Sequence, residues 1–347
     1  MNIKPEKIKK ILCIKPRGIG DVVLSTVILE NLQNYFRNST VDYLTESFAA
    51  PAVENNPMVH KVLIMENKEF PLKAAWKIRK EKYDMILDLW SNPRSAQITF
   101  LSRVKYRVGF AYRGRKYAYN IPATSQRGKH HSAEHNLELL KILDVPIVSN
   151  NISYYLAQED DHKAKIFIDK TVPRDKTIIG IIPSGGWPSK RCDPEKWVEI
   201  CERITEKYNA VFLIIWGPGD ENDAQYIKRQ IPSKAYLIPS TGLNEAAGFI
   251  FNCALILAND SGPMHISAAM GKPTIGIFGP TSPMSHGPYS SKSGYVLKDD
   301  LFCIICNRRE CPYNHECFRD LPAGAVISKM EELAEKNKIL IKPHEKS

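Results

Sequence analysis

Short apolar runs alternate with helix-patterned runs along this chain, and several of the apolar runs end in a glycine-containing turn. Residues 11–14 are apolar, and the turn KPRGIG leads from them into residues 22–36, whose apolar positions have helical spacing. The same alternation continues through the runs TVDYLT, VHKVLIM and YDMILDLW, with helical patterns between them. Strands that alternate with helices predict a parallel sheet with helices on both faces. The fold class indicated is α/β, of the Rossmann-like kind.

The alternation occurs twice. A polar and charged stretch at 153–176 interrupts it, and the order of strand and helix restarts with TIIGIIPSGG at residue 177. A chain of 347 residues is long enough for two domains. We therefore expect a Rossmann-like domain over 1–165, a second over 175–325, and a C-terminal helix and tail over 326–347.

Composition and charge narrow the class of partner. No apolar run approaches the roughly 18 residues of a membrane span, and the apolar run at 11–14 is too short for a secretory leader, so a cytoplasmic protein is expected. The net charge of +10 favours an anionic partner. No acidic residue occurs between Asp88 and Glu134, while that segment holds several aromatic residues and the basic residues Arg94, Arg103, Lys105, Arg107, Arg113, Arg115, Lys116, Arg127 and Lys129. Without a nucleic-acid motif, a phosphorylated lipid or sugar explains this charge better than nucleic acid, and a solvated basic surface remains the alternative.

The first glycine turn places an acid at a helix start. Gly18 and Gly20 let backbone approach a ligand closely, and Asp21 follows them. An aspartate here is most often a helix N-cap, but a carboxylate facing a substrate hydroxyl would also serve as a general base. Because Val23 stands where a dinucleotide fingerprint has its third glycine, an NAD site is disfavoured.

Two loops of the second half have residues suited to a diphosphate or a ribose. Ser184, Gly185 and Gly186 follow a predicted strand, and Lys190 comes shortly after them. A lysine beside a glycine-rich turn neutralises phosphate charge, although an ordinary exposed lysine is equally compatible with the spacing. Glu221 follows a Gly-Pro-Gly turn, where it would accept hydrogen bonds from ribose hydroxyls or simply belong to the turn.

The stretch LANDSGPMHISAAMGKP joins an apolar run to a run of small residues. Asp260 ends the predicted strand, Ser261 and Gly262 turn the chain, and His265 lies in the first turn of the helix that follows. Free backbone N–H groups at a helix start bind anions, so this turn is a candidate diphosphate site. A histidine beside an aspartate and a helix start is a better candidate ligand than a lone packed histidine.

Half of the eight cysteines fall within fifteen residues. They are Cys303, Cys306, Cys311 and Cys317. The first two form a C-x2-C pair, a spacing compatible with a structural zinc. Reduced thiols and a disulfide are the alternatives, and a cytoplasmic setting disfavours the disulfide. Cys13, Cys201 and Cys253 lie in apolar runs and are expected to pack in the core.

Taken in order along residues 10–325, several stretches resemble the bacterial lipopolysaccharide heptosyltransferases, glycosyltransferase family 9. They are KPRGIGDVVLSTVILENLQNYF, YDMILDLWSNPRSAQITFLSRVKYRVGF, WPSKRCDPEKW and NDSGPMHISAAMGKPTIGIFGPTSP. The resemblance implies a GT-B fold, in which two Rossmann-like domains face a cleft, and inverting transfer from an ADP-activated heptose without an obligatory metal.

The resemblance also implies roles for single residues. Asp21 takes the place of the general base, Lys190 that of the diphosphate-binding lysine, and the donor loop comprises Asp260, Ser261, Gly262 and His265. Some members have hydroxyl residues before the lysine where this chain has Gly185 and Gly186. Backbone N–H groups or Ser184 would replace those contacts.

We therefore expect an inverting glycosyltransferase that uses an ADP-heptose-like donor and a phosphorylated glycolipid acceptor at the cytoplasmic face of the inner membrane. No cofactor is required for this chemistry, since a base and positive charge at the leaving diphosphate suffice. A nucleotide-sugar epimerase and a non-catalytic sugar-binding assembly protein are the alternatives.

Overall fold

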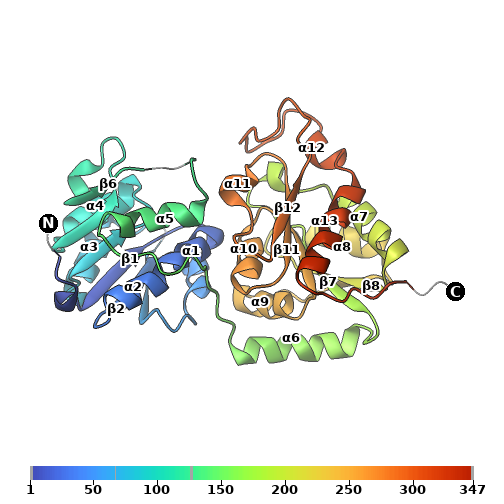
Figure 1. Cartoon of the computed structure of the whole chain (residues 1–347), viewed down its shortest axis with the longest axis horizontal. Helices are drawn as coiled ribbons and strands as arrows, with labels where there is room; N and C mark the ends of the chain where they lie inside the picture. The colour runs from blue at the N-terminus through green and yellow to red at the C-terminus, as the bar shows by residue number, and fades with distance from the viewer. Residues whose placement is uncertain (1–2, 67, 126–127, 345–347) are drawn as a thin grey trace. The chain divides into compact units, whose positions relative to one another are not determined.

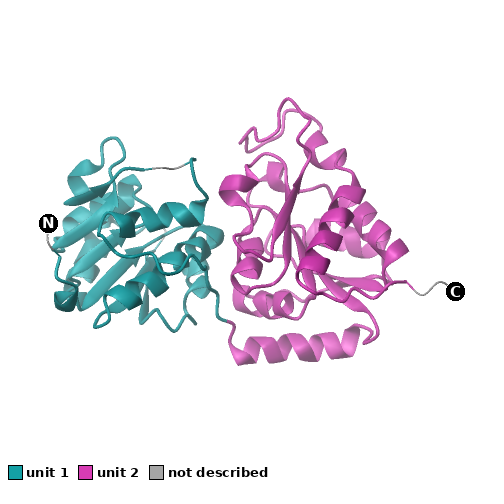
Figure 2. Cartoon of the chain, in the orientation of Figure 1, with its two compact units in different colours: residues 1–155 teal, residues 156–347 magenta. Residues whose placement is uncertain are grey.

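The computed structural model describes residues 3–66, 68–125 and 128–344. The chain forms two compact units, residues 1–155 and 156–347 (Figure 2). Each unit contains one six-stranded sheet, and all the paired strands run parallel (Figure 1). The two sheets with their flanking helices confirm the predicted α/β class and the presence of two Rossmann-like domains. Among the described residues, no helix is long and apolar enough to span a membrane.

The sheet of the first unit has the strand order β3-β2-β1-β4-β5-β6. Its strands are β1 (Lys10–Ile14), β2 (Thr40–Thr45), β3 (Lys61–Ile64), β4 (Met85–Asp88), β5 (Tyr106–Phe110) and β6 (Ile121–Ala123). The helical segments are η1 (Pro5–Lys7), α1 (Ile19–Ser25), η2 (Thr26–Ile28), α2 (Leu29–Tyr35), η3 (Ser47–Ala52), α3 (Pro71–Glu81), α4 (Pro93–Ser102), η4 (Lys116–Ala118) and α5 (Ser132–Lys141).

The predicted helix over 22–36 is divided by the 3-10 turn η2. The hydroxyl groups of Ser25 and Thr26 each donate to the carbonyl three residues earlier, on Val22 and Val23, at 2.7 Å. Such local bonds compete with the helical ladder and bend the chain at that point. The bend therefore has a cause that is visible in the sequence.

The second unit repeats the plan with the strand order β12-β11-β10-β7-β8-β9. Its strands are β7 (Thr177–Ile182), β8 (Ala210–Ile214), β9 (Ala235–Leu237), β10 (Leu255–Asn259), β11 (Thr274–Phe278) and β12 (Gly294–Leu297). The helical segments are α6 (Gln158–Thr171), η5 (Pro188–Lys190), α7 (Pro194–Lys207), α8 (Glu221–Gln230), α9 (Leu243–Phe251), α10 (Gly262–Ala269), α11 (Pro283–His286), α12 (Glu316–Arg319) and α13 (Ala323–Lys336).

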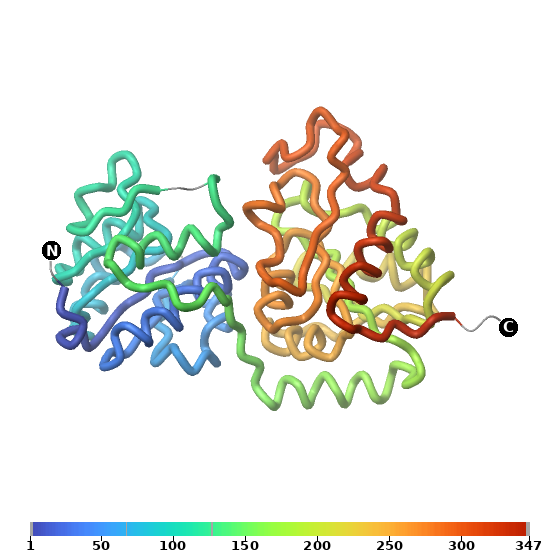
Figure 3. Tube along the Cα trace, in the orientation of Figure 1, coloured from blue at the N-terminus to red at the C-terminus, as the bar shows by residue number. Residues whose placement is uncertain are grey.

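The boundary between the units lies earlier than the sequence suggested, between Tyr155 and Leu156. The polar stretch expected to mark the boundary forms α6, which packs on α9 of the second unit (Figure 3). The contact is close, because a Cβ added at Gly248 of α9 would lie 2.4 Å from the Asp160 carbonyl oxygen of α6. Polarity here reflects the solvent-facing side of a helix.

The C-terminal helix also belongs to the second unit. Val326, Met330 and Leu333 of α13 are buried in the core cluster that contains Trp197 of α7 and Phe212 of β8. The segment 326–347, which we expected to be a separate helix and tail, thus begins inside a helix that completes this core.

The connections of each sheet reverse direction at one place. In the first unit the reversal falls between β1 and β4, and in the second between β10 and β7. Ligands of open α/β sheets bind at the carboxyl ends of the strands at such a switch point. The fold thus marks two places to search for functional residues, one in each unit.

Candidate active site

Asp21 lies at the switch point of the first sheet, in the first turn of α1. The N-cap of this helix is Gly18, with a φ of +79°, so the common N-cap interpretation of Asp21 is wrong. The Asp21 side chain folds back over Gly18, since a Cβ at position 18 would lie 2.4 Å from Asp21 Oδ2. Gly20 is the second residue of α1. The Asp21 side chain is 44% exposed, which leaves its carboxylate accessible.

A buried lysine that the sequence analysis missed stands beside Asp21. The Lys15 Nζ lies 3.8 Å from Asp21 Oδ1, with only 8% of the side chain exposed. It donates a 3.3 Å hydrogen bond to the Leu89 carbonyl after β4 and lies 5.0 Å from the centroid of the Trp90 ring. Lys15 therefore joins the ends of the two strands that flank the switch point. The sequence signal that could have identified Lys15 is its place directly after an apolar strand.

Lys190 and Asp260 form an ion pair at the switch point of the second sheet. Their Nζ and Oδ2 atoms are 2.6 Å apart, and the side chains are 16% and 8% exposed. Thr281, after β11, donates to the same Asp260 oxygen at 2.7 Å. Burial raises the pKa of the Asp260 carboxyl, but the Lys190 ammonium outweighs it, so that this pKa lies below its ordinary value. The pair is charged and held from three loops.

The rest of the predicted donor loop surrounds this pair. Ser261 is the N-cap of α10, but its side chain makes no capping bond. Its Oγ is buried and has no hydrogen-bond partner within the described part of the chain. Gly262 begins α10, and the buried His265 acts electrostatically to lower the pKa of Asp260. A buried hydroxyl of this kind usually has a partner, so it points to a ligand contact.

The loop after β7 is held by an arginine that the sequence analysis did not single out. Arg191 donates to the carbonyls of Gly185 and Gly219, each at 3.2 Å, and its NH2 lies 2.9 Å from Asp220 Oδ1. It thereby ties the loop after β7 to the turn after β8. Gly185 is buried and Gly186 is exposed, with Ser184 partly exposed before them.

Of the two acidic residues after the Gly-Pro-Gly turn, only Asp220 belongs to this network. Glu221 is exposed at the start of α8 and accepts a 3.0 Å hydrogen bond from Gln225 of the same helix. Its role in binding a ribose stays a prediction.

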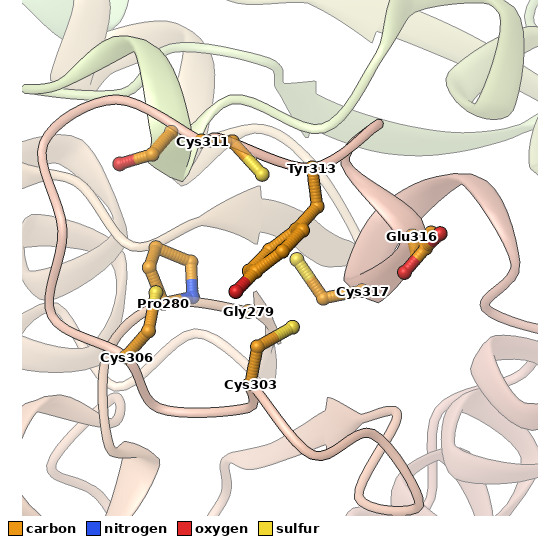
Figure 4. A pocket seen from close by; sticks show the side chains of 9 residues that line it. Gly279, Pro280, Cys303, Cys306, Cys311, Tyr313, Glu316 and Cys317 are labelled. Atoms are coloured by element: carbon orange, nitrogen blue, oxygen red, sulfur yellow. The ribbon is translucent and has the colours of Figure 1, made fainter.

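Four cysteine side chains line one pocket, together with Tyr313, Glu316, Ser189, Gly279 and Pro280 (Figure 4). The Tyr313 ring points into the space among the thiols. Burial and the nearby Cys311, Cys303 and Cys306 raise the pKa of the Cys317 thiol to about 12.

Across the described ranges, no group of three or more His, Cys, Asp or Glu side chains is arranged to hold a metal ion. Zinc needs deprotonated thiols around one point, and the zinc site at these cysteines stays a prediction. Cys13, Cys201 and Cys253 are buried, as expected.

The cysteine loop is bonded to the turn that carries Lys190 and to the turn before Thr281. The Ser189 N–H donates to the Arg309 carbonyl at 3.2 Å, and the Ser189 hydroxyl donates to the Arg308 carbonyl at 2.6 Å. The N–H groups of Ile305 and Asn307 donate to the carbonyls of Gly279 and Pro280, at 3.1 and 2.7 Å. The loop therefore supports the positions of Lys190 and Thr281.

The basic run of the first unit divides into two groups. Arg94 donates to the carbonyls of Glu66 and Glu69, Arg107 to those of Val104 and Ala118, and Arg115 to that of Ser91. The exposed group consists of Arg103, Lys105, Arg113, Lys116 and Lys129, while Arg127 lies outside the described residues. Part of the charge is thus structural, and part faces solvent.

Comparison with known proteins assigns this arrangement to a family. The chain is 27% identical to lipooligosaccharide heptosyltransferase 2 of Haemophilus influenzae, covering 94% of this chain and 99% of that protein. Its structure matches a family 9 glycosyl transferase from Veillonella parvula (TM-score 0.81, 19% identity, 96% and 99% of the chains). It also matches the ADP-heptose LPS heptosyltransferase II of Escherichia coli (TM-score 0.77, 19% identity, 95% and 99%). Both comparisons confirm the GT-B fold class.

A family model describes the greater part of the sequence. The model of glycosyltransferase family 9 (heptosyltransferase) matches residues 72–316, more than half of the chain. The match includes Lys190 and the loop of Asp260, and it begins after Asp21. With the fold and both switch points in place, the chain belongs to glycosyltransferase family 9 and is a glycosyltransferase.

Proposed function

We propose that this glycosyltransferase transfers a heptose from ADP-heptose to a phosphorylated inner-core lipopolysaccharide acceptor, with inversion at the anomeric carbon. The observation that carries the proposal is the Lys190–Asp260 pair, bonded to Thr281 and placed beside the buried Ser261 hydroxyl. The family model and the names of the relatives support heptose and lipopolysaccharide as substrates.

The second unit is assigned to the donor. A lysine ammonium has three N–H donors, and the Asp260 carboxylate engages the Lys190 ammonium at 2.6 Å. The remaining donors are available to the diphosphate, whose negative charge grows as the sugar leaves. Ser261 and the backbone of the Gly185–Gly186 loop would add neutral hydrogen bonds to the same oxygens.

The first unit is assigned to the acceptor. The Asp21 carboxylate removes the proton of the attacking hydroxyl while its oxygen forms the new bond to the anomeric carbon. The bond between that carbon and the diphosphate oxygen breaks, and ADP leaves with the electron pair. Attack from the side opposite to the leaving group inverts the configuration. Lys15 fixes the position of Asp21 through its 3.8 Å contact.

The acceptor is assigned to a glycolipid with phosphate groups at the cytoplasmic face of the inner membrane. The exposed basic residues between Arg94 and Lys129 supply the complementary charge. Positive charge at the leaving group comes from Lys190 in this proposal, so no step requires a cofactor. A structural zinc at the cysteine loop would be a separate matter, which metal analysis of the purified protein decides.

Thermal shift with ADP-, UDP-, GDP- and CDP-sugars tests the donor, since a ligand raises stability according to its affinity and concentration. We expect ADP-heptose to give the largest shift, and incubation with a deacylated, phosphorylated core acceptor to give the glycosylated product. A shift for another nucleotide, or an altered sugar formed from donor alone, would replace the proposal with a different transferase or an epimerase. Donor binding without turnover on any core acceptor would indicate a sugar-binding protein.

A further inference from the structure

Helix α3 and its neighbours expose large apolar side chains that the proposed chemistry does not use. Phe70 is 72% exposed, Leu72 52% and Trp76 54%, and the adjoining Phe100 and Tyr117 are 48% and 51% exposed. Leu72 and Trp76 lie one turn apart on α3, so both project from the same side of the helix. Side chains of this size are ordinarily exposed singly, and five of them on adjoining elements indicate an interaction surface.

These residues belong to one continuous layer. Helices α3 and α4 pack against each other on the same sheet (Figure 1). Arg79 of α3 donates to the Leu101 carbonyl of α4 at 2.5 Å, and the rings of Phe100 and Tyr117 meet edge to face with centroids 5.3 Å apart. We call this surface the α3–α4 face.

The exposed ionisable residues of α3, of the turns after α3 and α4, and of η4 are basic: Lys73, Arg79, Lys80, Lys82, Arg103, Lys105 and Lys116. The exposed acid nearest to them in the sequence, Glu66, precedes Phe70. Lys80 lies 3.4 Å from the centroid of the Trp76 ring, so the cation and the apolar side chain share one site.

The acids of residues 68–120 do not balance this charge. Glu69 is buried and pairs with Lys77, and Glu81 pairs with Lys10 and Lys61. Asp84 accepts from the backbone N–H groups of Lys9 and Lys10, and Asp88 is fully buried.

We infer that the α3–α4 face docks on a bilayer that contains anionic lipid. Exposed Phe, Leu and Trp beside lysines on one helix match the interface between acyl chains and headgroups, where aromatic rings and long cationic side chains are both favoured. Each lysine or arginine near an anionic surface adds about 1 kcal/mol of attraction. A phosphate-only partner such as RNA would use the charges but would leave Leu72 and Phe70 without a function.

A chain of contacts connects this face to the candidate base. Phe70 follows Glu69, whose carbonyl accepts from Arg94. Arg94 also lies 3.8 Å from Glu46, and Glu46 pairs at 3.0 Å with Arg17 in the turn before Asp21. The docked face would therefore bring the carboxyl edge of the first sheet near the membrane surface. That a lipid-linked acceptor meets Asp21 there rests on the proposed function, whereas docking does not.

Co-sedimentation of the full chain with vesicles tests the inference. We expect binding to phosphatidylcholine mixed with phosphatidylglycerol, weak binding to phosphatidylcholine alone, and release at high salt. The double variant Leu72→Ser, Trp76→Ser should weaken binding about tenfold through lost apolar contact. The double variant Lys73→Glu, Lys80→Glu should weaken it about thirtyfold or more.

Matched controls have the same chemistry elsewhere on the surface. The exposed Val148 and Leu340, changed together to Ser, and the exposed Lys170 and Lys336, changed together to Glu, should bind vesicles like the parent. Circular dichroism checks the fold of every variant. The emission of Trp76 should shift to shorter wavelength on vesicles, and Trp76→Phe should remove that shift while binding persists.

Absence of binding to anionic vesicles, equal loss in the control variants, or binding to single-stranded RNA in preference to vesicles would each overturn the inference. The proposed function is measured separately, as sugar transfer to a deacylated acceptor in solution. The α3–α4 face variants should leave that transfer unchanged. A chain that binds vesicles but transfers no sugar would refute the function and leave the docking face standing.

Discussion

Each of the two sheets pairs a lysine with an aspartate at its switch point, but the more exposed partner is the aspartate in the first unit and the lysine in the second. In the first unit the lysine is buried and the carboxylate is accessible, with Lys15 at 8% and Asp21 at 44% exposure and 3.8 Å between them. In the second unit the carboxylate is the more buried partner, and Lys190 contacts Asp260 at 2.6 Å.

The difference indicates which charge each sheet offers to a substrate. A buried lysine that lies near an accessible carboxylate keeps that carboxylate in place and leaves its oxygens available to a hydroxyl proton. A buried carboxylate that binds a lysine tightly orients the ammonium and leaves its other N–H groups available to an anion. In the proposed function, the same two residue types therefore provide a base in one unit and an anion site in the other.

The largest expected effect comes from removing the accessible carboxylate. Asp21→Asn should lower kcat about 10² to 10⁴-fold, the usual contribution of a positioned general base, while the donor dissociation constant stays unchanged. Steady-state kinetics and donor titration measure the two quantities. Glu30→Gln, at an exposed carboxylate on the adjoining α2, should leave both unchanged. Loss of donor affinity with normal kcat in Asp21→Asn would reverse the assignment of the units.

Removing the ammonium of the second unit should affect the donor. Lys190→Met should weaken donor binding and lower kcat together, by about 10²-fold, because a charge that stabilises the leaving group is lost. The buried Lys196 is a matched control, since it also contacts a carboxylate, Glu199, at 2.6 Å. Lys196→Met should cost stability and spare donor affinity. If both variants weaken the donor equally, Lys190 has only a structural role.

The buried carboxylate predicts a dependence of stability on pH. Because the folded pKa of Asp260 lies below its ordinary value, its ionised form stabilises the folded chain above about pH 4, and this contribution is lost as the pH falls through the lower folded value. Urea unfolding of the parent and Asp260→Asn from neutral to acidic pH should give a stability difference that shrinks below about pH 4. Thr281→Val, which removes one hydrogen bond to Asp260, should give a stability between those of the parent and Asp260→Asn. A stability difference between the parent and Asp260→Asn that is constant with pH would contradict an ionised Lys190–Asp260 pair.

The buried lysine of the first unit should have a smaller, positional effect. Lys15→Met frees Asp21 to move and should lower kcat about tenfold with little change in KM, since small misplacement of a catalytic group is costly. Lys10, at the other end of the same strand β1, is the matched control because it also pairs with a carboxylate, that of Glu81. Lys10→Met should leave kcat unchanged. A change in KM alone would assign Lys15 to acceptor binding.

Much of the site was predictable because parallel strands end at a common edge. Lys190 and Asp260 are far apart in the sequence, yet each follows a strand, β7 and β10, and these strands are neighbours in the sheet. Four strands, β5, β6, β9 and β12, were missed because none has a clear apolar pattern. β5 begins with the partly buried Tyr106 and Arg107, β6 contains Pro122, β9 has three residues, and β12 is only partly buried.

Contacts that depend on register or on loop conformation were not predictable. Lys15 meets Asp21 because β1 pairs with β4 in a register that aligns Ile14 with Asp88 and brings the Leu89 carbonyl to the Lys15 ammonium. Arg191 connects two loops whose shapes no local pattern determines. The α6 boundary was misplaced because the exposed side of a helix and a linker share the same composition.

The smallest expected effect distinguishes two adjacent glycines, Gly185 and Gly186, in the loop after β7 of the second unit. A Cβ at Gly185 would lie 2.8 Å from Arg191 Cγ and 3.2 Å from the Arg191 nitrogen, whereas a Cβ at Gly186 would meet nothing within 4 Å. Gly185→Ala must displace Arg191 and should cost about 1 kcal/mol of stability and a few-fold in donor affinity. Gly186→Ala should change neither.

Thermal unfolding and donor titration of both alanine variants measure this difference. These measurements show whether the proposed anion site of the second unit depends on the loop that Arg191 holds, just as we predict that the proposed base of the first unit depends on Lys15. If Gly185→Ala loses stability but keeps full donor affinity, the backbone of this loop does not contact the diphosphate. Lys190 and the turn at Ser261 would then hold the donor without it.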